Sequence, residues 1–251
     1  MHLKHYNLKT IIKTGNLYIG LFLLSIIFAT ACKTINEPIL GGTVKDVDGN
    51  EYHTVIIGNQ TWMIENLKTT HYSDNTDILM VSDSAAWRNL VSAGYCWYNN
   101  DSTSNKNVFG ALYNWYTVDA GKLAPQGWHV PDETDWTTLE NNVTDLLYAS
   151  GSLAKILAAT TNWNRSLNMG SIGFNPVINN SSKFTALPGG SRENYIHSFN
   201  SIDSTGVWWS ATSKTDTTAL SMVMKCDQSS VIRYNKKKWN GFSVRCVKDS
   251  N

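Results

Sequence analysis

Apolar and polar residues alternate where the folded part of the chain begins. The segment 43–57 alternates on both sides of Asp48-Gly49, which suits a two-residue type I′ turn because Asp and Gly tolerate positive φ. Gly58-Asn59 marks a second turn before the apolar run 61–64. The pattern predicts a β-hairpin over 43–57 and a further strand directly after it.

Two helices are predicted in the middle of the chain from their caps and apolar spacing. Asp132 is placed to cap the first helix, with Asp135 three residues later as its capping-box partner. Ser152 is placed to cap the second helix. The residues expected on the buried faces are Trp136, Leu139, Val143 and Leu147 in the first helix, and Leu153, Ile156 and Leu157 in the second.

Three strand-like segments follow, at 219–225, 231–234 and 241–247. In the last of these, Phe242, Val244 and Cys246 alternate with Ser243 and Arg245, which is the period of a half-buried strand. The basic run 236–238 lies between two strand-like segments and is interpreted as a solvated turn.

Two long stretches, 65–108 and 160–206, are polar and irregular. Turns are expected at Gly170, Gly173 and 188–190. Loops of this length are usually functional or disordered, and these contain too many aromatic residues for simple disorder. We expect any binding site to lie in them.

The first 31 residues have the pattern of an export signal. Three lysines and no acidic residue precede an apolar run at 17–28, which is too short for a membrane span of about 20 residues. The small residues 29–31 then lead to Cys32, an arrangement that resembles a bacterial lipobox. We predict a lipoprotein signal peptide at 1–31, lipidation of Cys32 and a tether at 32–41. The alternatives are an ordinary signal peptide with a chance cysteine, or an uncleaved anchor.

Charge and cysteine content narrow the function. Without residues 1–31 the chain carries 18 basic and 20 acidic residues, a net charge of −2, so nucleic acid is not an expected partner. Three cysteines remain after Cys32, namely Cys96, Cys226 and Cys246. Outside the cytoplasm two of them should oxidise, which leaves one thiol over, and spacing leaves all three pairings open.

Seven short motifs in a fixed order suggest a family. They are GNQTWMIENL at 58–67, YCWYNN at 95–100, GALYNW at 110–115, APQGWHVP at 124–131, ALPGG at 186–190, WWSAT at 208–212 and GFSVRCV at 241–247. Together they resemble the Fibrobacter succinogenes major paralogous domain, which is common in lipoproteins of Bacteroidetes and Fibrobacter. The resemblance runs over 42–249, nearly all of the chain after the tether.

The resemblance implies a fold and a disulfide. The segments 129–136 and 241–244 are also similar to the formylglycine-generating-enzyme branch of the C-type-lectin-like folds. This implies an α+β, C-type-lectin-like fold, with two helices beside a mainly antiparallel sheet and long irregular loops. Cysteines at the positions of Cys96 and Cys246 commonly occur together in the family, which implies a Cys96–Cys246 disulfide. The rival pair is Cys226–Cys246, whose segments are candidates for neighbouring strands.

Catalytic and metal-binding patterns are missing from the sequence. It has no Gly-x-Ser-x-Gly elbow, His-Glu-x-x-His helix or Cys-x-x-Cys pair. His129 suits a structural role, and the first turn of a helix explains the acids Glu133 and Asp135 through its dipole and caps. The run 46–50 lacks the order of an EF-hand, and 160–206 lacks the calcium tripeptides of sugar-binding lectins. We therefore expect no enzyme activity, metal or cofactor.

The remaining prediction is a binding or adhesion module of the cell envelope, lipid-anchored in the outer membrane, with carbohydrate as one ligand class. Its partners would be the membrane, through the anchor, and an unidentified glycan or envelope protein. Aromatic rings beside amide and charged groups are what such sites require. The candidate positions are Trp163, Asn164, Arg192, Glu193, Asn194, Tyr195 and His197. The alternative is that Trp163 belongs to the core and that Arg192 and Glu193 pair on the surface. Two other functions stay open: a structural surface or fimbria-associated subunit, and an enzyme of unknown reaction.

Overall fold

An N-terminal hairpin opens the fold, as its alternating pattern predicts. Strand β1 (Ile39–Lys45) pairs antiparallel with β2 (Glu51–Ile57). The backbone N–H of Gly49 donates to the Asp46 carbonyl at 3.0 Å, and Gly49 has φ of 78°. The connection is thus a type I turn closed by a left-handed glycine, a three-residue loop where a two-residue one is predicted. The second turn at Gly58-Asn59 is confirmed, since β3 (Gln60–Met63) pairs with β2 directly after it.

The computed structural model describes residues 37–146, 151–193 and 198–250. The predicted signal peptide, Cys32 and residues 32–36 of the tether lie outside these ranges. Within them, β1 already begins at Ile39, so the last residues of the predicted tether belong to the first sheet. Residues 36–251 form a compact unit of their own, and every described strand and helix falls between 39 and 248.

The first sheet has the strand order β1-β2-β3-β12-β6. The C-terminal strand β12 (Val247–Lys248) lies between β3 and β6 (Trp128–His129) and pairs antiparallel with both. The predicted strand over 241–247 is therefore replaced by single bridges at 241–243 and this short strand. The predicted half-buried alternation is also wrong, because Ser243 and Arg245 are as deeply buried as their apolar neighbours.

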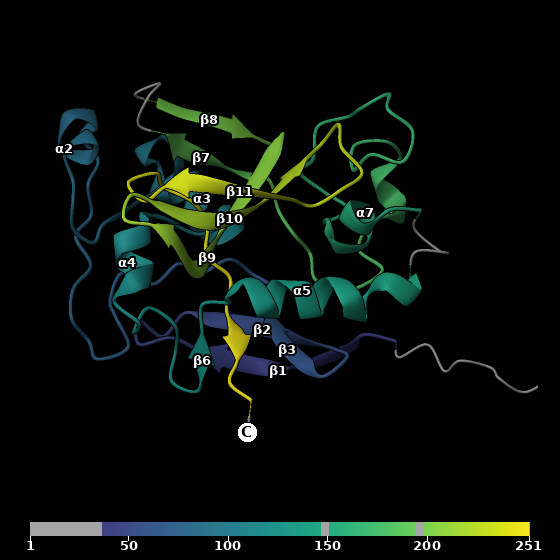
Figure 1. Cartoon of the computed structure of the whole chain (residues 1–251), viewed down its shortest axis with the longest axis horizontal. Coiled ribbons are helices and arrows are strands. Elements are labelled where there is room, and N and C mark those ends of the chain that lie inside the picture. Colours follow the sequence, from purple (N-terminus) through teal and green to yellow (C-terminus); the bar gives the residue numbers. More distant parts are fainter. Residues whose placement is uncertain (1–36, 147–150, 194–197, 251) are drawn as a thin grey trace, which may run out of the picture. The chain divides into compact units, whose positions relative to one another are not determined.

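The second sheet has the strand order β11-β10-β9-β7-β8 (Figure 1). Its strands are β7 (Gly189–Glu193), β8 (Ser198–Ile202), β9 (Thr205–Thr215), β10 (Thr218–Lys225) and β11 (Ile232–Lys237). The segments 219–225 and 231–234 are thus confirmed as strands. The prediction of irregular loop up to 206 is wrong at β7, at β8 and at the start of β9. Strands β7 and β8 pair with each other as a hairpin, but the glycines of β7 and the polar residues of both strands give no apolar alternation from which to predict it.

The two predicted helices and their N-caps are confirmed, but the first is shorter than predicted: it ends at Asn142 with Val143 as its C-cap, and Leu147 lies outside the described residues. Helix α5 (Glu133–Asn142) starts with the complete capping box of Asp132 and Asp135, and α7 (Leu153–Leu157) starts at the Ser152 cap. Helix α5 lies between the two five-stranded sheets (Figure 1): Asn142 donates to the Ile57 carbonyl of β2 at 3.2 Å, and Glu140 pairs with Arg233 of β11 at 3.1 Å.

Shorter elements connect these parts. They are α2 (Ser84–Arg88), β4 (Tyr95–Cys96), η1 (Tyr98–Asn100), α3 (Ser102–Phe109), β5 (Leu112–Tyr113), α4 (Trp115–Asp119), η2 (Thr144–Leu146) and η3 (Pro176–Ile178). Together with the two sheets they make an α+β fold with mainly antiparallel pairing, as predicted. The prediction of two helices beside one sheet, with irregular loop over 65–108, is wrong, because that stretch contains α2 and α3 and the strands form two large sheets. Among the described residues, no helix combines the length and the apolar content needed to cross a membrane.

Three apolar clusters form the core, and the supposed loops contribute to all of them. Trp87, Cys96 and Tyr98 from the stretch 65–108 form one cluster with Val81 and Leu112. The second includes Trp209, Phe242 and Cys246, and the third includes Trp62, Trp136 and Trp208. Most aromatic residues of the long loops thus pack in the core.

A buried polar network joins segments that are far apart in the chain. The Asn66 side-chain oxygen accepts hydrogen bonds from Trp208 Nε1 and from the Arg245 guanidinium, each at 2.9 Å. Arg245 also donates to the backbone carbonyls of Phe184 and Thr185. Burial lowers the pKa of Arg245 to about 9, so the side chain is still protonated at neutral pH. Because these polar groups are shielded from water, each depends on the others for its hydrogen bonds.

The cysteines contradict the predicted disulfides. Cys96, Cys226 and Cys246 are all free thiols. Cys96 and Cys246 are buried in two different apolar clusters, and Cys226 packs against the third. Cys226 follows β10, whose neighbours are β9 and β11, whereas Cys246 precedes β12 in the other sheet. Both the Cys96–Cys246 pair and the rival Cys226–Cys246 pair are therefore wrong for this structure.

Candidate binding groove

The second sheet carries a polar groove on the face turned away from α5. Alternation along a strand sends neighbouring side chains to opposite faces. On β10, Met222 and Met224 face the cluster that contains Trp136 of α5, while Val223 faces the groove. The groove has a volume of about 550 Å³. It is lined by Ser191, Glu193, Asn200, Ser201, Ser204, Thr205, Val207, Val223, Lys225, Cys226, Asp227, Tyr234 and Lys236.

Glu193 is the most unusual group in the groove. Lys236 Nζ donates to its Oε1 at 3.2 Å, while its Oε2 is buried and has no hydrogen-bond partner. A buried carboxylate oxygen without a partner costs free energy that a donor on a ligand would recover. Because Oε2 is closed off from solvent, a hydroxyl or amide group that enters the groove reaches it only after the Glu193 carboxylate rotates toward the groove.

The other walls supply hydroxyls, one amide and one aromatic ring. Ser191 donates to the Asn200 side-chain oxygen at 3.3 Å, and the two residues face each other across β7 and β8. Tyr234 on β11 is 42% exposed and has Lys236 Nζ 5.9 Å from its ring centre. Val207 and Val223 are buried beneath. The groove thus combines an apolar floor, an aromatic wall and many neutral hydrogen-bonding groups.

Charges in the groove are balanced, since Glu193 and Asp227 stand against Lys225 and Lys236. Nothing here favours a strongly charged ligand, such as a nucleic acid, over a neutral one. The one thiol, Cys226, has its pKa raised by burial, and a nucleophilic cysteine needs a lowered one. Among the described lining residues there is no histidine to act as a base for a serine. The arrangement is suited to binding.

The predicted site residues divide between the groove and the core. Glu193 lines the groove, and the exposed Asn164 lies at its rim, where it donates to Ser204 at 2.9 Å. Trp163 is buried and donates to the Ala186 carbonyl at 3.0 Å, so it belongs to the core, as the alternative interpretation has it. Asn194, Tyr195 and His197 lie outside the described residues.

Arg192 is a correction to the prediction. As the strand neighbour of Glu193 it points to the opposite face, where it donates to the carbonyls of Val81 and Ser82 at 2.6 and 2.9 Å. Its guanidinium lies 4.6 Å from the ring centre of Trp87. It is buried, so it neither reaches a ligand in the groove nor pairs with Glu193 on the surface.

Several groove residues are missing from the sequence prediction. The alternation of Ile232, Tyr234 and Lys236 along β11 is the sequence signal that points to them, but the basic run 236–238 favours the interpretation as a solvated turn. In the structure Lys236 belongs to β11, and Lys238 is buried with its Nζ 4.1 Å from the ring centre of Trp115. Ser191 and Asn200 give no local signal, because β7 and β8 have no apolar alternation that predicts a strand.

A second hollow of about 470 Å³ lies where the C-terminal segment meets α5, lined in part by Asn59, Asp135 and Asp249. His129 bridges the two carboxylates, at 3.0 Å from Asp135 and 2.7 Å from Asp249. Glu133 pairs instead with Lys214 at 2.5 Å. Asp135 is engaged by the capping box and by His129, and His129 also links it to Asp249 of the C-terminal segment, so the cluster has the structural role that is predicted for His129.

The His129 bridge makes stability depend on pH. The hydrogen bond to Asp135, assisted by Asp249, raises the pKa of His129 to about 9 against the opposing effect of burial. A raised pKa means that the stabilisation is complete below about pH 6.5 and is lost as pH rises through about 9. Between pH 6 and pH 9.5 the free energy of unfolding of the wild type should fall by about 1 kcal/mol more than that of His129→Gln. The difference is no larger because solvent screens this half-exposed pair. Urea unfolding of both proteins at the two pH values measures this, and parallel losses would contradict it.

Comparison with known proteins decides the family. The Fibrobacter succinogenes major domain matches residues 55–248. The chain belongs to the Fibrobacter succinogenes major domain family. No curated protein and no solved structure matches the chain significantly.

The motifs that carry the Fibrobacter succinogenes major domain resemblance are structural in this chain. Asn66, Trp208 and Arg245 come from the first, sixth and seventh motifs and meet in the buried network. Leu187 to Gly190 leads into β7, where Gly190 approaches the Tyr98 ring so closely that a Cβ would lie 2.7 Å from it. The groove residues Glu193, Tyr234 and Lys236 lie outside all seven motifs.

Proposed function

We propose that this protein is a lipid-anchored binding or adhesion module of the cell envelope, and that its ligand-binding surface is the groove of the second sheet. The observation that carries the proposal is the buried Glu193 Oε2, which has no hydrogen-bond partner in an otherwise polar groove. Unsatisfied buried acceptors are uncommon and call for an explanation. A hydroxyl group of a bound ligand provides one.

Carbohydrate is the ligand class that best matches the groove. A sugar presents several hydroxyl groups and an apolar ring face, and sites for it combine directional polar groups with an aromatic wall. Ser191, Asn200 and Glu193 supply the polar groups, and Tyr234 supplies the aromatic surface. We further propose that the α+β fold is of the C-type-lectin-like kind, which the sequence resemblance implies.

A glycan array tests the proposed function. The chain from Lys33 onward keeps every described strand and helix, so it is the sample to apply. We expect retention by at least one neutral polysaccharide or oligosaccharide. A chain that binds no glycan, or that turns over a bound one, would contradict a carbohydrate-binding module.

Glu193→Gln is the groove variant with the clearest expected result. The amide keeps the shape but loses the charge, and charge-assisted hydrogen bonds are about twice as strong as neutral ones. We expect binding of the array-selected glycan to weaken by about tenfold. Glu133→Gln is the matched control, because Glu133 pairs with Lys214 away from the groove and should leave affinity unchanged. Titration calorimetry measures both, and equal affinities for wild type and Glu193→Gln would count against the groove.

Lipid anchoring is tested in cells. Residues 29–32 follow an apolar run and resemble a lipobox. We expect radiolabelled palmitate to enter the wild-type protein and to be absent from Cys32→Ala, because the thiol is the acylated group. Equal labelling of the two proteins would contradict lipidation at Cys32.

A further inference from the structure

The loop 164–178 exposes an unusual amount of apolar side chain. Leu167 is 95% exposed and Met169 is 85% exposed. The loop also exposes Phe174, Val177 and Ile178. Single exposed apolar residues are normal, but a group of them on one loop marks an interaction surface.

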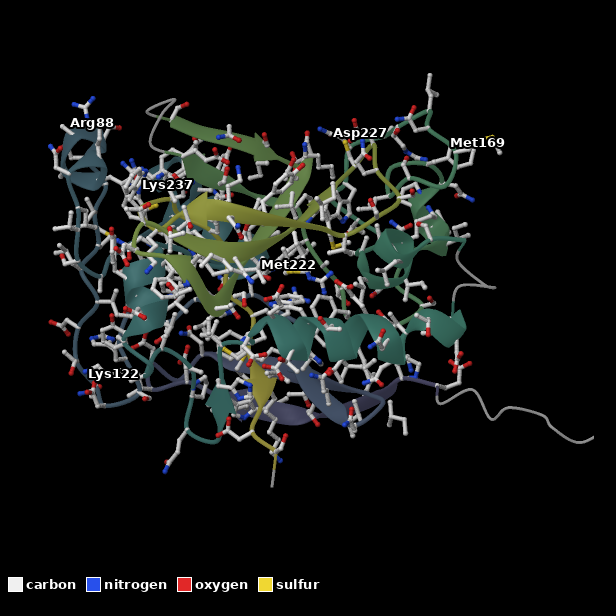
Figure 2. All side chains as sticks on the ribbon, in the orientation of Figure 1. Arg88, Lys122, Met169, Met222, Asp227 and Lys237 are labelled. Carbon is white, nitrogen blue, oxygen red and sulfur yellow. The ribbon has the colours of Figure 1, made fainter. Side chains whose placement is uncertain are left out.

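The loop is held in this conformation by hydrogen bonds between its backbone and residues outside it. Lys155 of α7 is buried, and its Nζ donates to the carbonyls of Ser171, Phe174 and Asn175 at 2.6 to 3.3 Å. The N–H of Gly173 donates to the Cys226 carbonyl at 2.7 Å. The loop is thus fixed at its base, while Leu167 and Met169 project away from the protein; Figure 2 shows Met169 pointing outward.

Charge around this loop identifies the occupant. The chain has no Asp or Glu from 146 to 192, while Arg165 and Lys183 are exposed there. Two acids outside this stretch, Asp203 and Asp227, meet the loop through their backbone carbonyls, and Lys225 lies beside Asp227 in the chain. The loop therefore combines apolar tips with its own cations, a combination that complements a bilayer with anionic headgroups. The other exposed apolar group, Leu79 and Val91 near α2, has Asp77 and Asp83 close in the chain and lacks this complementarity.

The position of the proposed anchor agrees with a membrane partner. Lys183 Nζ donates to the Pro38 carbonyl at 2.9 Å, which fixes the start of β1 close to the segment that follows the loop. From Cys32 to Glu37 the chain spans at most about 18 Å. Figure 1 shows β1 beginning at the end of the domain that carries α7, and Figure 2 shows Arg88 of α2 at the opposite end.

We propose that the loop 164–178 is a membrane-docking surface, which inserts Leu167 and Met169 into the interface of an anionic lipid bilayer. This inference rests on the proposed anchoring at Cys32. Docking of the loop sets the orientation of the tethered domain at the membrane. Because Asn168 donates to the Asp227 carbonyl at 3.0 Å, the groove end at Asp227 lies beside the docked loop. Ligand would then be held close to the membrane surface.

Vesicle cosedimentation of the unacylated chain from Lys33 onward tests the proposal. The probe is vesicles of phosphatidylglycerol and phosphatidylcholine, compared with phosphatidylcholine alone. We expect the wild type to bind the anionic vesicles and the double variant Leu167→Ser, Met169→Ser to bind about tenfold more weakly. The control is Leu79→Ser, Val91→Ser, which removes comparable exposed apolar surface at the other end and should bind like the wild type.

Three outcomes would overturn the docking surface: no binding by the wild type, equal binding by the loop variant, or equal losses in the loop and control variants. All the substitutions are at exposed positions, so thermal unfolding should show the variants folded. Glycan binding and palmitate labelling are measured separately. Loss of vesicle binding alone therefore counts against the loop and leaves the groove and the anchor standing.

Discussion

Arg245→Ala should lower the free energy of unfolding by about 3–5 kcal/mol, which is the largest effect that we expect from a single substitution. The guanidinium is fully buried and donates to Asn66 and to the carbonyls of Phe184 and Thr185. Its removal leaves a cavity and these acceptors without their donor, and each orphaned buried acceptor costs about 1–3 kcal/mol. Urea unfolding followed by tryptophan fluorescence measures the change.

The matched control for this prediction is Arg165→Ala, in which an exposed arginine is removed and stability should stay within about 0.5 kcal/mol of the wild type. Arg245→Lys should fall in between, because a lysine keeps the charge but cannot reproduce the planar fork. Equal stabilities of Arg245→Ala and Arg165→Ala would show that the network with Asn66 and Trp208 does not hold the two sheets' segments together.

Lys155→Met should lower the free energy of unfolding by about 2–4 kcal/mol, because three backbone carbonyls lose their shared donor. Methionine keeps most of the volume, so the effect reports hydrogen bonds more than packing. Amide hydrogen exchange at 171–175 should accelerate beyond the global change, since the Lys155 ammonium holds that segment. Burial lowers the pKa of Lys155, because the ammonium is withdrawn from water.

Lys183→Met is the control, since Lys183 is exposed and donates to one carbonyl, that of Pro38. Its effect should stay below about 1 kcal/mol. If Lys155→Met exchanges at 171–175 no faster than Lys183→Met, the ammonium does not organise the loop 164–178.

Local signals carried most of what the sequence predicted correctly. The capping box of Asp132 and Asp135, the Ser152 cap and the Gly58-Asn59 turn depend on residues within a few positions of one another, so their chemistry is readable from the sequence. The family was likewise identifiable from motifs with fixed order. What the caps and the turn share is that residues within a few positions of one another satisfy them, without a distant contact.

Non-local contacts account for what was missed. Strand β7 pairs in parallel with β9, at Gly190 and Gly206. No alternation of apolar and polar residues in the sequence predicts this strand. Arg192 reaches the Val81 carbonyl across 111 residues of sequence, which turns a candidate ligand contact into a buried link. The loop aromatics Trp87, Trp97 and Trp163 are buried for the same reason. Propensity reports local preference, and tertiary packing overrides it.

Non-local contacts also explain why the predicted binding site is only partly correct. Glu193 was a candidate and lines the groove, but its partners Lys236 and Tyr234 come from a strand some forty residues away. Only the sheet order β11-β10-β9-β7-β8 brings them to one face. A binding site assembled from one face of a sheet therefore cannot be read from a single loop.

The most direct test of the account is hydrogen exchange of the chain from Lys33 onward, with and without the glycan selected by the array. If the groove is the binding site, amides of β7, β10 and β11 next to Glu193, Lys225 and Tyr234 should exchange more slowly in the complex, and Glu193→Gln should reduce this protection. Protection confined to the second hollow, at 59–61 and 247–250, or no protection in the second sheet, would contradict the groove as the binding surface.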